Sequence, residues 1–408
     1  MPQPRTEAWI TGIGLVSSLG EGLEQHWQRL GSHASPSVAV EEVRYAPYPV
    51  HPLVPLDFSK QIPKTSDQRQ MERWQRIGVY AAGLALADAG ILGKPEFLDN
   101  VDLAIAAGNG ERDLALDTSI LESAGRSGAP GADLNRQLMA GLRPTLYLGQ
   151  LSNLLAGNIS IVHKATGSSR TFKGEEMAGV AALEDAVKRI TSDQSDLMLA
   201  GAALNAERQD LLLNLELGGA LLQGCYRPVW ARGKVGGGMV PGSIGVFLVL
   251  ESPRHAIARG ARPYARVSTI SATRSHRAPG QAASAAQELF EAIAPSIDSV
   301  HPLGVLSGVS GVEPVTHEEA TFLDGLARFD LHSVVRAYGS VLGHGVEAHF
   351  ISGIALAALA LSKGSFFAPF QGTESEAIGE QRQVLVTAFG HWRGEALGLV
   401  EAVAAGTP

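Results

Sequence analysis

Apolar and polar positions follow two alternating patterns along the chain. Short apolar runs, which are typical of buried strands, are separated by stretches in which apolar residues recur with the period of a helix. One such stretch, Glu175–Ile190, places Val180, Leu183 and Val187 on a single face. The alternation predicts an α/β fold. The predicted strands are 9–14, 101–107, 196–201, 243–251, 264–270, 303–306 and 384–389, and the predicted helices are 71–89, 175–190, 282–293, 318–327 and 346–361.

The second half of the chain repeats this strand and helix pattern more loosely than the first. We therefore expect a duplicated architecture, with one half over 1–255 and the other over 256–408. No short sequence period is visible, which excludes a solenoid. The segment 124–131 contains three glycines and a proline and predicts a surface loop.

Composition and charge narrow the class of protein. Of the 408 residues, 45% are apolar and 18% are charged, so the chain can bury a large core. The net charge of −8 argues against nucleic acid as the main partner. The polar start of the chain lacks the apolar core of a signal peptide, and no uninterrupted apolar run reaches membrane-spanning length, so we expect a cytoplasmic protein. The single cysteine, Cys225, excludes an intrachain disulfide and a cysteine-rich metal site; we expect a buried, inert thiol and no metal.

Five motifs in the chain resemble those of β-ketoacyl-acyl-carrier-protein synthases, and they occur in the family's order. They are Ile10-Thr11-Gly12-Ile13-Gly14, Gly167 to Glu176, Arg227-Pro228-Val229-Trp230, Gly339-Ser340-Val341-Leu342-Gly343-His344 and Ala388-Phe389-Gly390-His391. The resemblance implies a thiolase-like fold, in which duplicated βαβαβ halves form a five-layer αβαβα sandwich.

The resemblance also implies that the family's catalytic residues are largely replaced. In the family, a cysteine nucleophile stands nine residues after the first glycine of the second motif, and Glu176 occupies that position here. Val309 stands at the position of the first catalytic histidine, Gly339 at that of the lysine, and His344 retains the second histidine. A carboxylate cannot form the acyl thioester that condensation requires.

Substrate contacts are implied at Val309, Gly339 and the turn of Phe389 and Gly390, whose backbone would contribute to an oxyanion hole. The residues after this turn, His391-Trp392-Arg393, depart from the family's pattern. Glu176 then has two interpretations: a structural or interface role at a helix start, or a carboxylate that imitates an acylated nucleophile. His344 is either a remnant of the catalytic set or a retained packing residue.

Two surfaces are candidates for partner contacts. Lys64, Arg69, Arg73 and Arg76 form a basic run that either docks an acidic carrier protein or is a solvated helix face. The segment from Leu146 to Ile161, which includes Leu154 and Ile159, is apolar and resembles the helix and strand with which the family forms dimers.

The chain is therefore interpreted as a catalytically degenerate subunit of the chain-length-factor type. Its partner would be an active β-ketoacyl synthase in fatty-acid or very-long-chain acyl elongation, with acyl-carrier protein as a further partner. No cofactor of its own is expected, because phosphopantetheine would arrive on the carrier protein. Two alternatives stay open: a malonyl or acyl decarboxylase or acyltransferase that uses Glu176 and His344, and a homodimeric acyl-chain-binding protein.

Overall fold

The computed structural model describes residues 7–31, 36, 38–329 and 331–403, and its strands form one sheet path. The order along this path is β4-β3-β5-β6-β1-β7-β11-β10-β8-β9, and the short β2 pairs with β1 beside it. The strands are β1 (Ala8–Ser17), β2 (Gly20–Glu21), β3 (Asp102–Ala106), β4 (Ser169–Phe172), β5 (Leu197–Leu204), β6 (Ile244–Glu251), β7 (Ala265–Thr273), β8 (Leu303–Ser307), β9 (Ser333–Ala337), β10 (Gln383–Phe389) and β11 (Glu395–Glu401).

The sheet consists of two sets of five strands with the same topology. In the first set, β4, β3 and β5 are parallel neighbours, and β5, β6 and β1 are antiparallel neighbours. In the second set, β9, β8 and β10 are parallel neighbours, and β10, β11 and β7 are antiparallel neighbours. The two sets join where Ala8–Ile10 of β1 pairs antiparallel with Ala265–Val267 of β7. The duplication predicted from the sequence is therefore confirmed at the level of strand order and direction.

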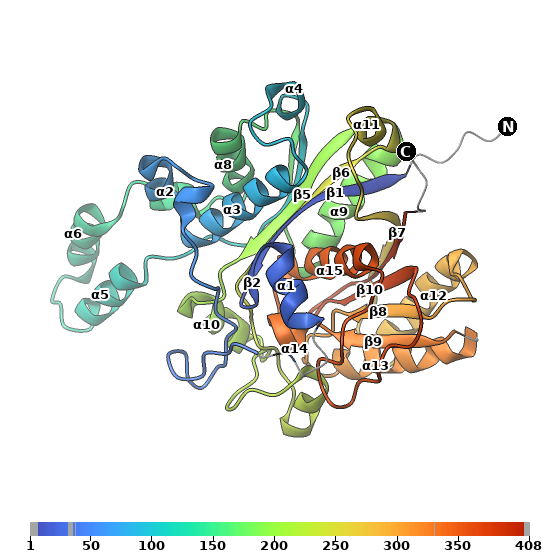
Figure 1. The fold of residues 1–408 in the computed structure, drawn as a ribbon. Helices are drawn as coiled ribbons and strands as arrows, with labels where there is room; N and C mark the ends of the chain where they lie inside the picture. Colours follow the sequence, from blue (N-terminus) through green and yellow to red (C-terminus); the bar gives the residue numbers. More distant parts are fainter. Residues whose placement is uncertain (1–6, 32–35, 37, 330, 404–408) are drawn as a thin grey trace.

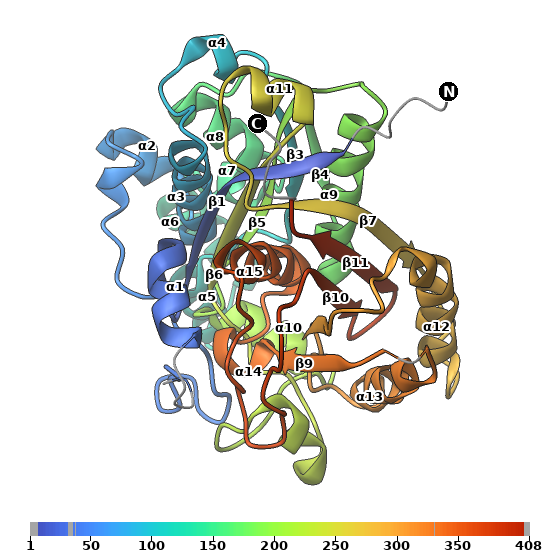
Figure 2. The same cartoon turned by 45° about the vertical axis from the view of Figure 1, so that its right-hand side comes forward.

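Helices cover both sets of strands and fill the space between them (Figures 1 and 2). Helices α3 and α8 pack on the outer face of the first set, and α12 and α13 pack on the outer face of the second set. Helices α9 and α15 pack between the two sets, so the layers are αβαβα as predicted. The helices are α1 (Gly22–Leu30), α2 (Thr65–Gln70), α3 (Arg73–Asp88), α4 (Pro95–Leu98), α5 (Leu114–Ala124), α6 (Pro130–Gly141), α7 (Leu146–Gln150), α8 (Leu154–His163), α9 (Glu175–Thr191), α10 (Gln209–Leu217), α11 (Pro253–Ala258), α12 (Gln281–Ile293), α13 (Val315–Gly325), α14 (Gly339–Leu342) and α15 (His349–Lys363).

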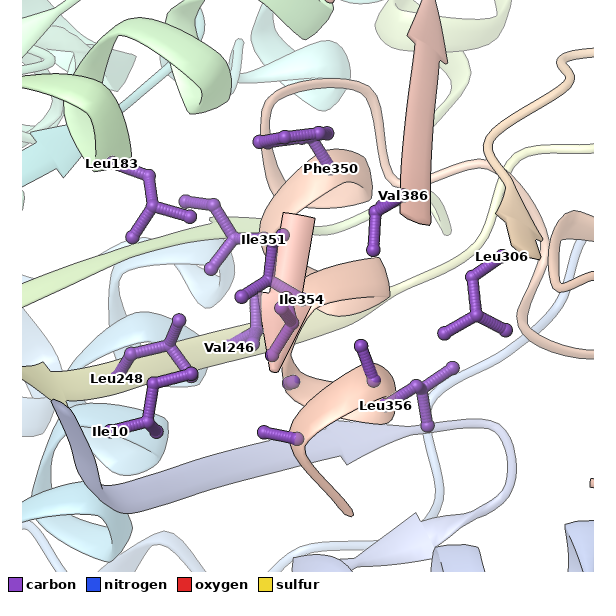
Figure 3. Packing of buried hydrophobic residues seen from close by; sticks show 14 of the residues in the cluster. Ile10, Leu183, Val246, Leu248, Leu306, Phe350, Ile351, Ile354, Leu356 and Val386 are labelled. Atoms are coloured by element: carbon purple, nitrogen blue, oxygen red, sulfur yellow. The ribbon is translucent and has the colours of Figure 1, made fainter. Parts of the chain in front are cut away.

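Helix α15 of the middle layer is surrounded by apolar side chains. Figure 3 shows Ile351 and Ile354 of α15 beside Val246 of β6, with Val386 of β10 on the other side of the helix. The segment Val346–Lys363 is long and apolar enough to cross a membrane, yet 89% of it is buried inside the protein. Its apolar character is therefore explained by its place between two sheets.

The glycines of β1 allow α3 to approach the sheet closely. A Cβ atom at Gly14 would lie 1.9 Å from the carbonyl oxygen of Ala81, a distance that no side chain can occupy. The helix itself begins with a capping box between Glu72 and Gln75. The glycines in the first strand therefore have a structural role: they leave room for helix α3 to pack on the sheet.

Each strand and helix predicted above overlaps an element of the structure, but four strands were not predicted: the two-residue β2, and β4, β9 and β11. β4 is mostly polar, β9 contains the buried Arg336, and β11 has a buried glutamate at each end, Glu395 and Glu401. β4 lacks the apolar run that marks the predicted strands, whereas β11 has one, Ala396–Val400, that the prediction missed. The predicted loop 124–131 is shorter than expected, because α5 ends at Ala124 and α6 begins at Pro130. The predicted boundary at residues 255 and 256 lies within α11, which connects the two sets.

Candidate functional site

The start of α9 lies against the turn between β10 and β11. The backbone enters the helix through Gly174 (φ 131°) and Glu175 (φ 47°), a left-handed conformation that is uncommon for a residue other than glycine. This entry turns Glu176 into the protein, where it is only 3% exposed. The carboxylate therefore needs partners inside the fold.

The hydrogen-bond partner of the buried Glu176 carboxylate is His391. The backbone N–H of His391 donates to Glu176 Oε1 over 3.0 Å, and the ring Nδ1 lies 2.7 Å from the same oxygen. Burial raises the pKa of the Glu176 carboxyl, but the charge and hydrogen bonds of His391 outweigh burial and hold that pKa below its usual range. Burial lowers the pKa of His391, but Glu176 outweighs it and raises the pKa. Each residue therefore favours the charged form of the other.

A second histidine, His344, lies near the same carboxylate oxygen. Its Nε2 is 3.6 Å from Glu176 Oε1, and its ring is 4.0 Å from the ring of His349, centroid to centroid. Burial lowers the pKa of His344 to about 4, although Glu176 opposes this shift. His344 is therefore neutral at pH 7, and the described structure gives its Nε2 no hydrogen-bond partner.

The turn that carries His391 is fixed by two arginines. Arg277 Nη2 donates to the carbonyl oxygens of Gly390 (2.6 Å) and Gly394 (3.1 Å). Arg393 Nη2 lies 3.3 Å from Glu175 Oε2. Two adjacent glutamates of α9 thus pair with two residues of one turn, although more than 200 positions separate them in the sequence.

Of the expected substrate-binding residues Gly390, Phe389 and Val309, only Gly390 lies next to Glu176. Gly390 faces the site, since a Cβ atom there would lie 3.4 Å from Glu176 Oε2. The side chain of Phe389 does not, because it packs in the outer cluster with Phe322 of α13, and successive strand residues face opposite sides of the sheet. The expected contribution of this turn through its backbone stays a prediction. Val309 is buried against Val229, so it lines no opening.

Gly339, at the start of α14, lies behind the histidines. A Cβ atom at Gly339 would lie 3.7 Å from Cε1 of His349. His349 in turn contacts His344, the neighbour of Glu176, and Gly339 itself also lies against Val309 and Val229.

A cavity of about 510 Å³ adjoins this group of residues. The turn of His391 and Arg393 forms one wall, and the ends of β3 and β5 and the helix α10 form the others. Glu347, which is 7% exposed, lines the cavity, and so does Asn205. Among the described residues, no group of three His, Cys, Asp or Glu side chains could hold a metal ion.

Of the predicted carrier-docking residues, Lys64 directly precedes α2, Arg69 lies on α2, and Arg73 is the first residue of α3. Lys64 and Arg69 are exposed, whereas Arg73 is partly buried and its Nη2 lies 2.8 Å from Glu207 Oε2. Arg73 is therefore already paired within the chain. Arg76 lies over the ring of Phe58.

The predicted dimer segment consists of two helices, α7 and α8, so the expected strand is absent from it. Ile159 has no exposed surface, because it packs in the cluster of α3, and a direct subunit contact through Ile159 is therefore wrong. Leu146 is also buried and Leu154 is half-buried. The exposed apolar residues of this segment are Tyr147 (69%), Leu148 and Ile161 (58%). Helical periodicity explains the error, since only one face of α8 can point outward.

Cys225 lies at the surface and not in the core, contrary to expectation.

Comparison with known proteins gives the family. Residues 6–256 match the model of the β-ketoacyl synthase N-terminal domain, which is more than half of the chain. The chain belongs to the β-ketoacyl synthase family. Among curated relatives, a 3-oxoacyl-[acyl-carrier-protein] synthase 2 of Rhizobium meliloti is 30% identical over 275 residues, which are 63% of this chain and 62% of that protein. The chain thus spans less than two thirds of the length of this relative.

Other similar proteins align with a larger share of this β-ketoacyl synthase family member. The oxytetracycline polyketide putative β-ketoacyl synthase 1 of Streptomyces rimosus is 24% identical over 371 residues, which are 87% of this chain and 84% of that protein. Among solved structures, the ishigamide ketosynthase/chain length factor superposes with a TM-score of 0.77 at 21% identity, over 98% of this chain and all of the other. The fold of the chain is therefore that of the ketosynthases.

Three residues of the site were not predicted from the sequence: His391 as a partner of Glu176, His349 and Glu347. His391 was noted only as a departure from the turn motif. Its position next to Gly390, together with an acidic residue at the nucleophile position, is the signal that could have indicated the pair. His349 and Glu347 lie on a segment for which only a helix was predicted.

Proposed function

We propose that this β-ketoacyl synthase family member is a catalytically degenerate subunit of the chain-length-factor type. One observation carries the proposal: the carboxylate of Glu176 is ionised, buried and hydrogen-bonded to the backbone N–H of His391. By the family resemblance, Glu176 stands at the position of the cysteine, and the turn amide is part of the oxyanion hole. The carboxylate therefore replaces the nucleophile and also occupies the donor that a reacting thioester would need.

The remaining histidine supports the same conclusion. His344 is neutral and lies beside an existing carboxylate, so it has no thiol to activate. Val309 and Gly339 provide neither a proton carrier nor a charge at the positions of the family's other polar residues. The arrangement resembles the acyl-enzyme intermediate of an active ketosynthase, with a carboxylate oxygen of Glu176 in the place of the thioester carbonyl oxygen.

A subunit without condensation chemistry would act through its surface. The edge strand β4 pairs only with β3 in the described sheet, and its residues Ser169 and Arg170 are exposed. Tyr147 and Ile161 are exposed apolar side chains in the segment that precedes β4. Open strand edges and apolar patches favour association with another protein. We propose an active ketosynthase as that protein, acyl-carrier protein as the source of the acyl chain, and the cytoplasm as the location.

Two measurements test this function. Intact-mass spectrometry after incubation with acyl-CoA and acyl-carrier protein is expected to find no covalent adduct, and an active ketosynthase treated in parallel is the control. Reconstitution with an active ketosynthase from the same organism is expected to change the length of that enzyme's products or the rate at which they form. An acyl adduct on the isolated protein, or identical products with and without it, would contradict the proposal.

The decarboxylase alternative predicts an activity of the isolated protein. A decarboxylase has to stabilise an enolate, and the Glu176 carboxylate occupies the N–H of His391 that could do so. Release of CO₂ from malonyl-carrier protein by the isolated protein, lost in His344→Ala, would establish the alternative.

A further inference from the structure

His391 lies between the buried carboxylate of Glu176 and the adjoining cavity. Its side chain is 11% exposed and lines the cavity, whereas Glu176 is buried behind it. The ring atom Nδ1 is 2.7 Å from Glu176 Oε1. Within the described residues, the other ring nitrogen, Nε2, has no hydrogen bond, and it is not among the buried side-chain atoms that lack a partner. Nε2 is therefore the ring nitrogen that reaches the cavity.

This arrangement is that of a histidine oriented and activated by a carboxylate. Because an ionised carboxylate only accepts hydrogen bonds, Nδ1 has to carry the ring hydrogen, and Nε2 of the neutral ring is left with its lone pair. Burial lowers the pKa of His391, but the charge and the hydrogen bond of Glu176 outweigh burial and raise the pKa. A raised pKa makes the neutral ring a stronger base, so Nε2 is able to take a proton from a water molecule in the cavity.

The cavity has further features that hydrolysis of an ester requires. Its volume of about 510 Å³ lies within the range typical of small-molecule sites, about 300–1,000 Å³. Leu211 and Leu215 give it an apolar side for a short hydrocarbon group. Lys173 also lines it, and the Nζ atom of Lys173 lies 3.3 Å from the neutral Oδ1 of Asn109, a contact that leaves its positive charge uncompensated. A cation in such a site can stabilise the oxyanion that forms when water adds to a carbonyl group.

We infer that Glu176 and His391 form a catalytic dyad that hydrolyses a small carboxylic ester in this cavity. His391 Nε2 removes a proton from water, and the oxygen of this water adds to the carbonyl carbon of the ester. The bond from this carbon to the leaving oxygen then breaks, and Nε2 returns the proton to that oxygen. The products are a carboxylic acid and an alcohol, and no covalent bond to the protein forms. This activity goes beyond the proposed function, which concerns the loss of condensation, and does not depend on it.

The test measures the hydrolysis of p-nitrophenyl acetate and p-nitrophenyl butyrate by the isolated full-length protein. We expect p-nitrophenol to be released over many turnovers, with a kcat/KM that rises with pH through an inflection above pH 6.5, where the His391 ring loses its proton. The charged and titratable groups that face this ring are Glu175 and Glu176 of α9, Arg277 and His344. Release of p-nitrophenol no faster than in buffer, or a rate without this inflection, would overturn the inference.

Two variants assign the activity to the dyad. His391→Gln keeps the backbone N–H that donates to Glu176 but removes the base, so we expect kcat/KM to fall about 100-fold. Glu176→Gln removes the carboxylate that raises the pKa of His391, so we expect a slower reaction with its inflection at a lower pH. If His391→Gln does not fold, the displaced inflection of Glu176→Gln carries the test. A rate and a pH profile that stay unchanged in the folded variants refute the dyad.

Cys225→Ser is the control for hydrolysis by an unrelated nucleophile. Cys225 is exposed, and an exposed thiol can itself react with a p-nitrophenyl ester. We expect Cys225→Ser to keep both kcat/KM and its pH profile. Activity that disappears in Cys225→Ser and persists in His391→Gln would contradict the inference. Either result leaves the proposed function untouched, because that function is tested by the acyl adduct and by reconstitution with a ketosynthase.

Discussion

Glu176 accepts two hydrogen bonds from one residue, His391, through the backbone N–H at 3.0 Å and the ring Nδ1 at 2.7 Å. The first bond uses a main-chain group that any residue at this position would offer. The second exists only because residue 391 is a histidine. The ion pair is thus a property of this sequence superimposed on a backbone arrangement that belongs to the fold.

Removal of the charge on Glu176 should destabilise the protein in a pH-dependent way. His391 has a raised pKa when folded, so its pairing stabilises the protein below the ordinary value of 6.5 and is lost as the pH rises through the raised value. Glu176→Gln is expected to cost about 2 kcal/mol at pH 6 and less at pH 9, measured by urea unfolding. Glu175→Gln, whose pair with Arg393 is half-exposed, is the matched control and should change little at either pH. An equal loss at both pH values would mean that the pair is not ionic.

Restoration of the cysteine alone should not restore condensation. Glu176→Cys creates a thiol at the family's nucleophile position, but Val309 and Gly339 still lack the polar functions of that family. We expect at most slow acylation by acyl-CoA and no condensation product, measured by mass spectrometry with malonyl-carrier protein. Efficient product formation by this single variant would show that the catalytic positions have been assigned wrongly.

Two isoleucines of α8 should respond in opposite ways. Ile159 is fully buried and Ile161 is 58% exposed. Ile159→Ala is expected to lower the free energy of unfolding by about 2–5 kcal/mol and to leave the subunit contacts intact in the folded fraction. Ile161→Lys, like Leu154→Asp, is expected to weaken dimers in light scattering with little effect on the stability of the subunit. A dimer that survives both charged substitutions would place the contact elsewhere.

The buried histidines should make stability fall in acid. Burial lowers the pKa of His51 from 6.5 to about 3, so between these pH values the unfolded chain binds a proton that the folded chain does not. His51→Leu is expected to reduce the slope of unfolding free energy against pH by about 1.4 kcal/mol per pH unit between pH 6 and pH 4.5. Glu319→Gln is the opposite control, because burial raises the pKa of Glu319 to about 7 and its removal should steepen the slope. An unchanged slope in His51→Leu would show that His51 takes up its proton in the folded state.

The sequence by itself determined the alternation of strands and helices, and it predicted a glutamate in place of the nucleophile. Both are local properties: an apolar run such as Val101–Ala107 specifies a buried strand, and a fixed spacing from Gly167 identifies Glu176. The polar β4, which the sequence did not reveal, is a strand because it pairs with β3, which is distant in the chain.

Only the tertiary structure decided what surrounds Glu176. The strand order brings the turn after β10 to the start of α9, so that residues 215 positions apart form one ion pair. The pleat of β10 turns Phe389 away and leaves the next positions to face the carboxylate. The direction of a side chain at the end of a strand, and the identity of its partner, follow from packing between layers, which the order of residues along the chain does not contain.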